Sequence, residues 1–76
     1  MATHADPARL RNRLRVARAE QRLSQGELAV LAGVTRQTIS SIENEQYVPS
    51  AYLAFILASK LGKPVDQLFY LEGDAP

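Results

Sequence analysis

The chain of 76 residues contains no cysteine, no tryptophan and only one histidine. Without cysteine it can form neither a disulfide nor a cysteine-ligated zinc site, which are the usual cross-links of small domains. A chain of this length buries only about 60% of the surface that its unfolded form exposes. We therefore expect one small domain, for which self-association is the remaining source of added stability.

Long apolar segments are also missing. The longest apolar run, Ala51–Ala58, is far shorter than the roughly 18 residues that cross a bilayer. Residues 1–7 lack the apolar core of a signal peptide. We therefore expect a cytoplasmic protein with no membrane partner.

The sequence lacks the residue patterns of catalysis as well. His4 is its single imidazole, and no glycine-rich phosphate loop, His-Glu-x-x-His segment or nucleophile elbow is present. The carboxylates are scattered, with no pair that local spacing would bring together. These absences predict a protein that is not an enzyme and that uses no metal or cofactor.

The net charge of +1 conceals an uneven distribution of charge along the chain. Residues 1–23 carry six arginines and two acidic residues, whereas residues 24–50 carry one arginine and three glutamates. Such a division indicates an anionic partner for one face, although a charged segment is also commonly just a solvated surface.

The spacing of apolar residues predicts five helices joined by short loops. Apolar residues from Leu10 to Ala17 recur at intervals of four and three, which predicts a first helix over residues 8–21, with a start signal at Asp6-Pro7. The other helices are expected over residues 24–33, 36–43, 51–61 and 64–68, and residues 68–71 are expected to form a final helical turn or a short strand.

The most informative segment is residues 24–44, in which two short helices are joined by a turn. Ser24 and Glu27 match the capping box at the start of the first helix, and Gly33 supplies its left-handed end. The turn is too short for the helices to run antiparallel over their length. This is the helix-turn-helix arrangement, in which the second helix enters a DNA major groove.

The residue pattern of the second helix favours a DNA-binding pair of helices over an ordinary junction between two helices. Ile39 and Ile42 fall on one side of it and predict the buried face. The opposite side is small and polar, with amide, hydroxyl and guanidinium groups of the kind that pair with base edges. A merely solvated helix would more often carry Lys and Glu at four-residue spacing, which this face lacks. The outward residues are Arg36, Gln37, Ser40, Ser41 and Asn44.

Three stretches, Leu14–Arg18, Leu23–Ala29 and Gly33–Glu43, carry a pattern that continues through Tyr47–Ser50 to Phe69. This pattern strongly resembles the DNA-binding domains of phage repressors, the Cro/CI or XRE-type family. The resemblance covers nearly the whole chain and implies an all-α, five-helix domain with a possible short C-terminal strand. Its expected divisions are an N-terminal arm (1–8), the domain (9–68), the motif (24–44) with its recognition helix (36–44), and a tail (69–76) that is a possible dimerisation element.

The resemblance also implies roles for individual residues. Arg36 and Gln37 would be the leading base readers, with Ser40 and Ser41 as shorter-range readers. Gln25 would donate to a phosphate from the first turn of its helix and brace the start of the recognition helix. Further phosphate contacts are expected from Thr35, Asn44 and Tyr47, although Tyr47 is almost equally expected to pack on the core.

Acidic residues near the recognition helix receive separate expectations. Glu43 would form an ion pair with Arg18 across helices, and Arg18 would have a secondary phosphate role. Glu45 stands where relatives usually have Gly, so it would strain a left-handed residue and place a negative charge near phosphates. No basic residue lies between Arg36 and Lys60, so the DNA affinity of one monomer should be modest.

Modest affinity favours a homodimer, because two half-sites about 34 Å apart double the contacts and match a palindromic operator. The apolar and aromatic tail is the expected interface. Alternatively, Leu68 and Phe69 close the core of the monomer itself. The expected interface residues are Val65, Leu68, Phe69, Tyr70 and Leu71.

The leading hypothesis is a sequence-specific regulator of transcription that binds double-stranded DNA and represses by excluding polymerase. One alternative is the antitoxin or controller half of a two-gene system, whose tail contacts a second protein. Another is a helical bundle for protein interactions that has lost DNA binding. Glu45 and the scarcity of lysine favour that last reading, whereas the polar face that begins at Arg36 opposes it.

Overall fold

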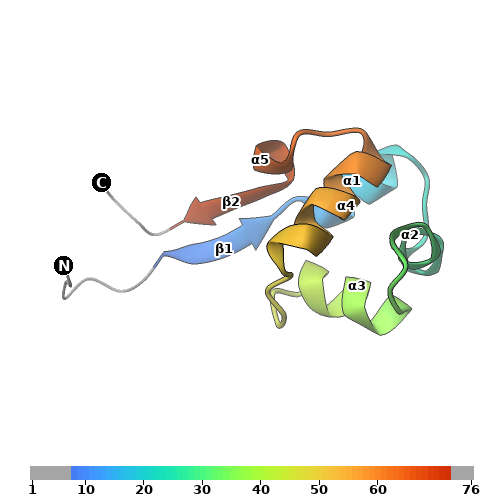
Figure 1. Ribbon diagram of the computed structural model, residues 1–76, viewed down its shortest axis with the longest axis horizontal. Coiled ribbons are helices and arrows are strands. Elements are labelled where there is room, and N and C mark those ends of the chain that lie inside the picture. The colour runs from blue at the N-terminus through green and yellow to red at the C-terminus, as the bar shows by residue number, and fades with distance from the viewer. Residues whose placement is uncertain (1–7, 73–76) are drawn as a thin grey trace.

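The computed structural model describes residues 8–72, which form five helices and one two-stranded sheet (Figure 1). The prediction of a five-helix domain with a short C-terminal strand is confirmed. Within the described range, no helix combines the length and the apolar character that a bilayer crossing requires. In chain order the elements are β1 (Arg9–Asn12), α1 (Leu14–Glu20), α2 (Gln25–Ala32), α3 (Arg36–Glu43), α4 (Ala51–Leu61), α5 (Val65–Leu68) and β2 (Phe69–Glu72).

The first helix is shorter than the sequence predicts, and the expectation of a helix over residues 8–21 is wrong in its first part. Helix α1 begins only at Leu14, and the residues before it form β1. Strand β1 pairs antiparallel with β2, from Arg9 opposite Glu72 to Asn12 opposite Phe69. Tertiary pairing therefore overrides the local helical pattern. The start signal at Asp6-Pro7 lies outside the described residues.

Three helices begin at hydroxyl side chains, as the sequence predicts. Ser24, Thr35 and Ser50 each accept a hydrogen bond from the backbone N–H three residues later. At Ser24 the capping box is complete, because the Glu27 carboxylate also accepts from the Ser24 N–H. Gly33 and Gly62 end α2 and α4 with φ of 75° and 68°. These local signals fix the lengths of the helices on either side of the motif.

One apolar core holds the helices together. Ile39 and Ile42 of α3 are 0% and 1% exposed, which confirms the predicted buried face of this helix. Helix α3 lies at the lower edge of the helical body in Figure 1, and the sheet projects from one end of that body. The largest fully buried apolar side chains are Leu14, Leu28, Ile39, Ile42, Leu57, Leu61 and Leu68.

Two residues other than glycine adopt the left-handed backbone conformation. Arg22, after α1, has φ of 57°, and Glu45, after α3, has φ of 62°. Each follows the end of a helix, where this conformation returns the chain toward the core. For a residue with a Cβ atom the conformation costs about 1–2 kcal/mol.

Replacing the exposed Arg22 by glycine should therefore stabilise the fold. We expect Arg22→Gly to raise the free energy of unfolding by about 0.5–1 kcal/mol, because relief of strain exceeds the added entropy of the unfolded chain. Urea denaturation measures the change. Arg22→Ala is the matched control, because it removes the same side chain and keeps the strain. Equal gains from both variants would contradict the explanation.

Candidate nucleic-acid interface

The outer side of α3 carries the four residues expected to read bases. Arg36 and Gln37 are exposed, and Ser40 and Ser41 are half-buried. The Gln37 amide donates to Ser41 Oγ at 3.1 Å, one turn later. Asn44 caps the end of the helix and is exposed. The structure therefore places these side chains together on one polar surface, away from the buried Ile39 and Ile42.

Arg36 is oriented by α2. Its Nη1 donates to Gln25 Oε1 at 3.3 Å, and its Cδ lies 3.9 Å from where a Cβ on Gly26 would stand. The Gln25 amide is itself fixed, because its Nε2 donates to Glu43 Oε1 at 3.1 Å. The amide oxygen is thereby turned toward Arg36. A buried carboxylate thus determines, through one amide, where the guanidinium points.

That carboxylate, Glu43, is fully buried, with a side-chain exposure of 0%. The expected ion pair with Arg18 is present, with Arg18 Nε 2.7 Å from Glu43 Oε2. Arg15 adds a contact that the sequence does not indicate, with its Nε 3.3 Å from Glu43 Oε1. Arg18 also donates to the backbone oxygen of Leu23 and is only 16% exposed. Its guanidinium is therefore committed to the interior of the motif.

The surroundings of Glu43 act on its pKa in opposite directions. Burial raises the pKa of the Glu43 carboxyl, whereas hydrogen bonds from Arg18, Gln25 and Arg15, together with the charge of Arg18, lower it. The lowering effects win, so the pKa of Glu43 lies below its ordinary value of 4.5. Glu43 is therefore charged at neutral pH and holds its donors in place.

The last turn of α3 is attached to β1 and α1. Asn12 Nδ2 donates to the backbone oxygen of Ile42 at 2.9 Å, and Arg15 Nη2 donates to Asn44 Oδ1 at 3.1 Å. Beyond the helix, Arg11 Nε lies 2.6 Å from Glu45 Oε2. Nothing in the local sequence marks Arg11 or Asn12 for this role, because their partners lie on a distant element.

These contacts use much of the positive charge near the N-terminus. Arg11 pairs with Glu45 and Glu72, and Arg15 and Arg18 share Glu43. The uneven charge in the sequence is thus partly balanced within the chain rather than offered to a partner. Of the other arginines, Arg13 has its guanidinium carbon 4.3 Å from the centre of the Tyr70 ring.

The remaining expected phosphate contacts lie at the edges of α3. Thr35 is exposed and caps the helix, and its Oγ1 also shares a hydrogen bond with Thr38 Oγ1 at 3.0 Å. Tyr47, in the loop after α3, is 47% exposed. Thr35 and Asn44 therefore mark the two ends of the polar surface, because each caps one end of the helix.

The tail contributes more to the core than to the surface. Leu68 is fully buried and Phe69 is 8% exposed, and Val65 packs against the same core. Val65 and Tyr70 are half-buried, and Leu71, which is 65% exposed, leaves the most apolar surface accessible. Two of the five residues expected to form a dimer interface thus close the core of the chain itself.

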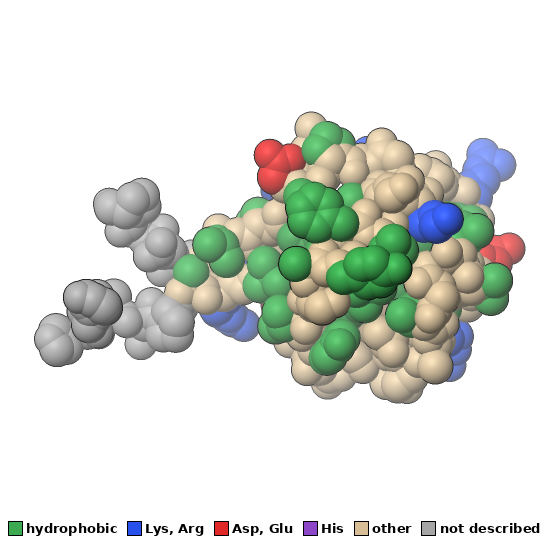
Figure 2. Space-filling view, viewed as in Figure 1, with side chains coloured by type: hydrophobic (Ala, Val, Ile, Leu, Met, Phe, Trp, Pro, Cys, Tyr) green, Lys and Arg blue, Asp and Glu red, His purple; other side chains and the backbone are tan. Residues whose placement is uncertain are grey.

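Helix α4 presents an aromatic surface that sequence reasoning missed. Tyr52 is 77% exposed and Phe55 is 61% exposed. Figure 2 shows hydrophobic side chains gathered on the face over α4 and continuing toward the sheet. The available signal was the unbroken apolar run Ala51–Ala58, because a helix apolar all round cannot bury every side in so small a domain.

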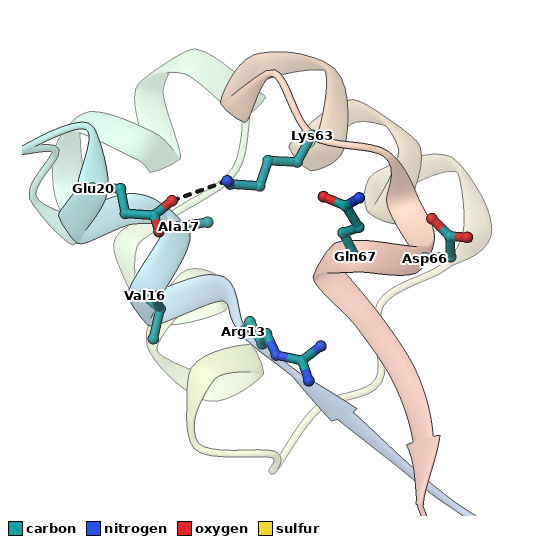
Figure 3. Close-up of a pocket in the computed structure, with 7 residues that line it drawn as sticks. All are labelled: Arg13, Val16, Ala17, Glu20, Lys63, Asp66 and Gln67. Atoms are coloured by element: carbon teal, nitrogen blue, oxygen red, sulfur yellow. Dashed lines mark ion pairs between the residues drawn. The ribbon is translucent and has the colours of Figure 1, made fainter.

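A hollow of about 340 Å³ lies between α1 and α5 (Figure 3). At its edge Lys63 Nζ lies 3.0 Å from Glu20 Oε1, so these two side chains form an ion pair. No residue of α2 or α3 lines it, so it is separate from the polar surface of α3. Among residues 8–72, no group of three or more His, Cys or acidic side chains is placed to hold a metal ion.

Comparisons with known proteins agree with this geometry. The model of the family described as Helix-turn-helix matches residues 14–68. An uncharacterized HTH-type transcriptional regulator of Methanocaldococcus jannaschii is 42% identical over 65 residues, which cover 86% of this chain and 98% of the relative. The HTH-type transcriptional regulator YgzD of Bacillus subtilis is 36% identical over 63 residues, which cover 83% and 96%.

A solved structure is similar as well. The restriction-modification controller protein C.AhdI from Aeromonas hydrophila superposes with a TM-score of 0.69 at 33% identity. The match covers 72% of this chain and 80% of that protein. The shared region therefore includes most of the helical body described above.

The lowered pKa of Glu43 predicts how stability depends on pH. A carboxyl whose pKa is lower in the folded than in the unfolded state stabilises the fold above its unfolded pKa, and this stabilisation is lost as the pH falls through the folded value. The free energy of unfolding should therefore drop as the pH falls below 4.5. In the Glu43→Gln variant, the free energy of unfolding should be about 3 kcal/mol lower than in the wild-type chain at pH 7, and it should fall less steeply in acid.

Denaturation with urea at several pH values between neutral and acid measures both effects. Glu20→Gln is the matched control, because it removes an exposed carboxylate that also contacts a cation. Equal losses at pH 7 and equal acid slopes in the two variants would contradict the assignment to Glu43.

Proposed function

We propose that this chain, which belongs to the helix-turn-helix family of DNA-binding transcriptional regulators, recognises a specific double-stranded DNA sequence with α3 in the major groove. The family is a non-enzymatic class. The observation that carries the proposal is the polar outer surface of α3, whose leading residue, Arg36, is already oriented by Gln25.

The chemistry of each side chain suggests what it would read. The Arg36 guanidinium suits the two acceptors of guanine, and the Gln37 amide suits the donor and acceptor of adenine. Gln37 would exchange its bond to Ser41 for the base, which frees that hydroxyl. Ser40 and Ser41 are short and neutral, and they would reach whichever base lies nearest.

Phosphate contacts would come from the edges of the same surface. Thr35 and Asn44 lie at the two ends of α3, and Gln25 lies in the first turn of α2. Exposed Tyr47 would add one hydroxyl. Arg18 would contribute little directly, because its guanidinium is already bonded to Glu43 and Leu23. Few of these groups carry charge, so one chain would bind weakly.

Weak binding by one chain supports a homodimer on a palindromic operator. We propose that the dimer surface combines Leu71 of the tail with Tyr52 and Phe55 of α4, because these apolar side chains are exposed. Pairing two such surfaces removes apolar area from water. Bound over a promoter in the cytoplasm, the dimer would repress by blocking polymerase.

A controller role is the second candidate. The similarity to a restriction-modification controller protein favours it. In that case the chain would regulate a neighbouring gene pair, or its α4 and tail would contact the partner protein. Copurification of a second protein with the chain would favour this candidate over self-association.

Selection from a randomised duplex pool, followed by fluorescence anisotropy, tests sequence recognition. We expect a palindrome bound about 10³-fold more tightly than random DNA. Arg36→Ala should cost about 1–3 kcal/mol on the selected duplex and relax preference at one base pair. Lys60→Ala, which removes an exposed charge on α4, is the control. A loss with Arg36→Ala that is equal on all sequences would make Arg36 a phosphate contact instead.

The dimer surface has its own test. We expect light scattering to report a dimer of the wild-type chain at high micromolar concentration, and a monomer for the Tyr52→Ser, Phe55→Ser double variant. Val30→Ser, which removes another exposed apolar side chain from α2, should leave the dimer intact. A wild-type monomer at that concentration would refute self-association.

A further inference from the structure

Glu45 places a carboxylate at an unfavourable position for a protein that binds DNA. It follows Asn44, the residue that caps the recognition helix, and lies two residues before Tyr47. Both neighbours are proposed phosphate contacts. A negative charge beside a phosphate is repelled, and the repulsion is strong wherever water is displaced. Glu45 also holds a strained left-handed conformation, with φ of 62°.

Arg11 compensates for this charge. Its Nε lies 2.6 Å from Glu45 Oε2, and its Nη1 contacts the carboxylate of Glu72 on β2. The side chains of Arg11 and Glu45 are only 34% and 27% exposed. The Glu45 carboxylate is thus partly withdrawn from solvent and directed toward the sheet. A single guanidinium therefore bridges the turn after α3 and the last strand.

The sheet determines where Arg11 stands. Arg11 lies opposite Tyr70 in the pairing of β1 with β2. The next residue, Asn12, fastens the end of β1 to the helices, because its amide donates to the Ile42 oxygen at 2.9 Å and accepts from the Leu14 N–H at 3.0 Å. These two bonds hold the end of β1 against the last turn of α3.

We propose that Arg11 is a positioning residue for DNA binding, which neutralises Glu45 and holds the turn after α3, so that the pairing of the two strands controls affinity for DNA. This inference rests on the proposed function. In this proposal the sheet affects DNA recognition, although its two strands are distant from α3 in the sequence. Arg11 acts through Glu45 and does not itself contact the phosphate.

A double-mutant cycle on the selected duplex tests the inference. Arg11→Ala should weaken binding roughly fivefold at low salt. In the Glu45→Gly background the same substitution should have no effect, because the charge to be neutralised and the strained residue are both gone. Arg9→Ala removes an equal charge from the same strand and is the matched control, with a smaller loss expected. Arg11→Gln is a second variant that keeps the first part of the arginine stem and a polar end but removes the charge, and it should behave as Arg11→Ala.

The outcomes are distinct. Restoration of affinity by Glu45→Gly, with circular dichroism unchanged in every variant, supports the inference. A fivefold loss in both backgrounds would overturn it, because Arg11 would then contact the phosphate directly. No loss in the wild-type background, or a loss equal to that of Arg9→Ala, would overturn it as well. If the wild-type chain selects no duplex, the proposed function fails first.

Discussion

The buried carboxylate of Glu43 is the constraint on which the arrangement of the motif depends. A charge without water is tolerated only if donors surround it. Here Arg15 and Arg18 come from α1 and Gln25 comes from α2, so three helices meet at one group. Because each donor also has a defined position on its own helix, the angle of α3 against α1 and α2 is limited. Glu43 therefore lies two hydrogen bonds from Arg36, the proposed leading base reader, with the Gln25 amide between them.

Several arginines of the N-terminal segment form ion pairs within the chain, so their charge stabilises the fold. Arg11, Arg15 and Arg18 each face a glutamate at or just after the end of α3. The surface left for DNA is rich in hydrogen-bonding groups and poor in charge. In the proposed DNA complex, such a surface would gain little from counterion release and would rely on the fit of neutral groups to base edges. The proposed function would therefore favour sequence specificity over strength of binding.

Much of this arrangement is predictable from local sequence. The capping box at Ser24, the glycine at Gly33 and the isoleucine pair of α3 each report a structure formed by near neighbours, and the ion pair of Glu43 with Arg18 follows from the family resemblance. Other features depend on residues far apart in the chain. Strand β1 has the spacing of a helix, and only its pairing with β2 reveals the strand.

The tail illustrates the same limit. The sequence leaves open whether Leu68 and Phe69 form a dimer surface or close the core, because their burial depends on how α5 and β2 fold back over the helices. The exposed aromatics of α4 are the converse case, since Tyr52 and Phe55 lie in the apolar run Ala51–Ala58, whose composition is typical of a core helix. The spacing of apolar residues identifies the faces of a helix, but the packing of the whole domain decides how many of those faces are buried.

The pairing of β1 with β2 also has a consequence for synthesis on the ribosome. Among the described elements, β1 is synthesised before the helices and β2 after them (Figure 1). Strand β1 therefore has no strand partner until β2 is synthesised. Pairing between such distant segments is slow, because loop-closure entropy is lost before the contacts stabilise the chain. Arg11 can reach its final position only once Glu72 has been translated and released. The chain must therefore be synthesised through β2 before Arg11 can contact both Glu45 and Glu72.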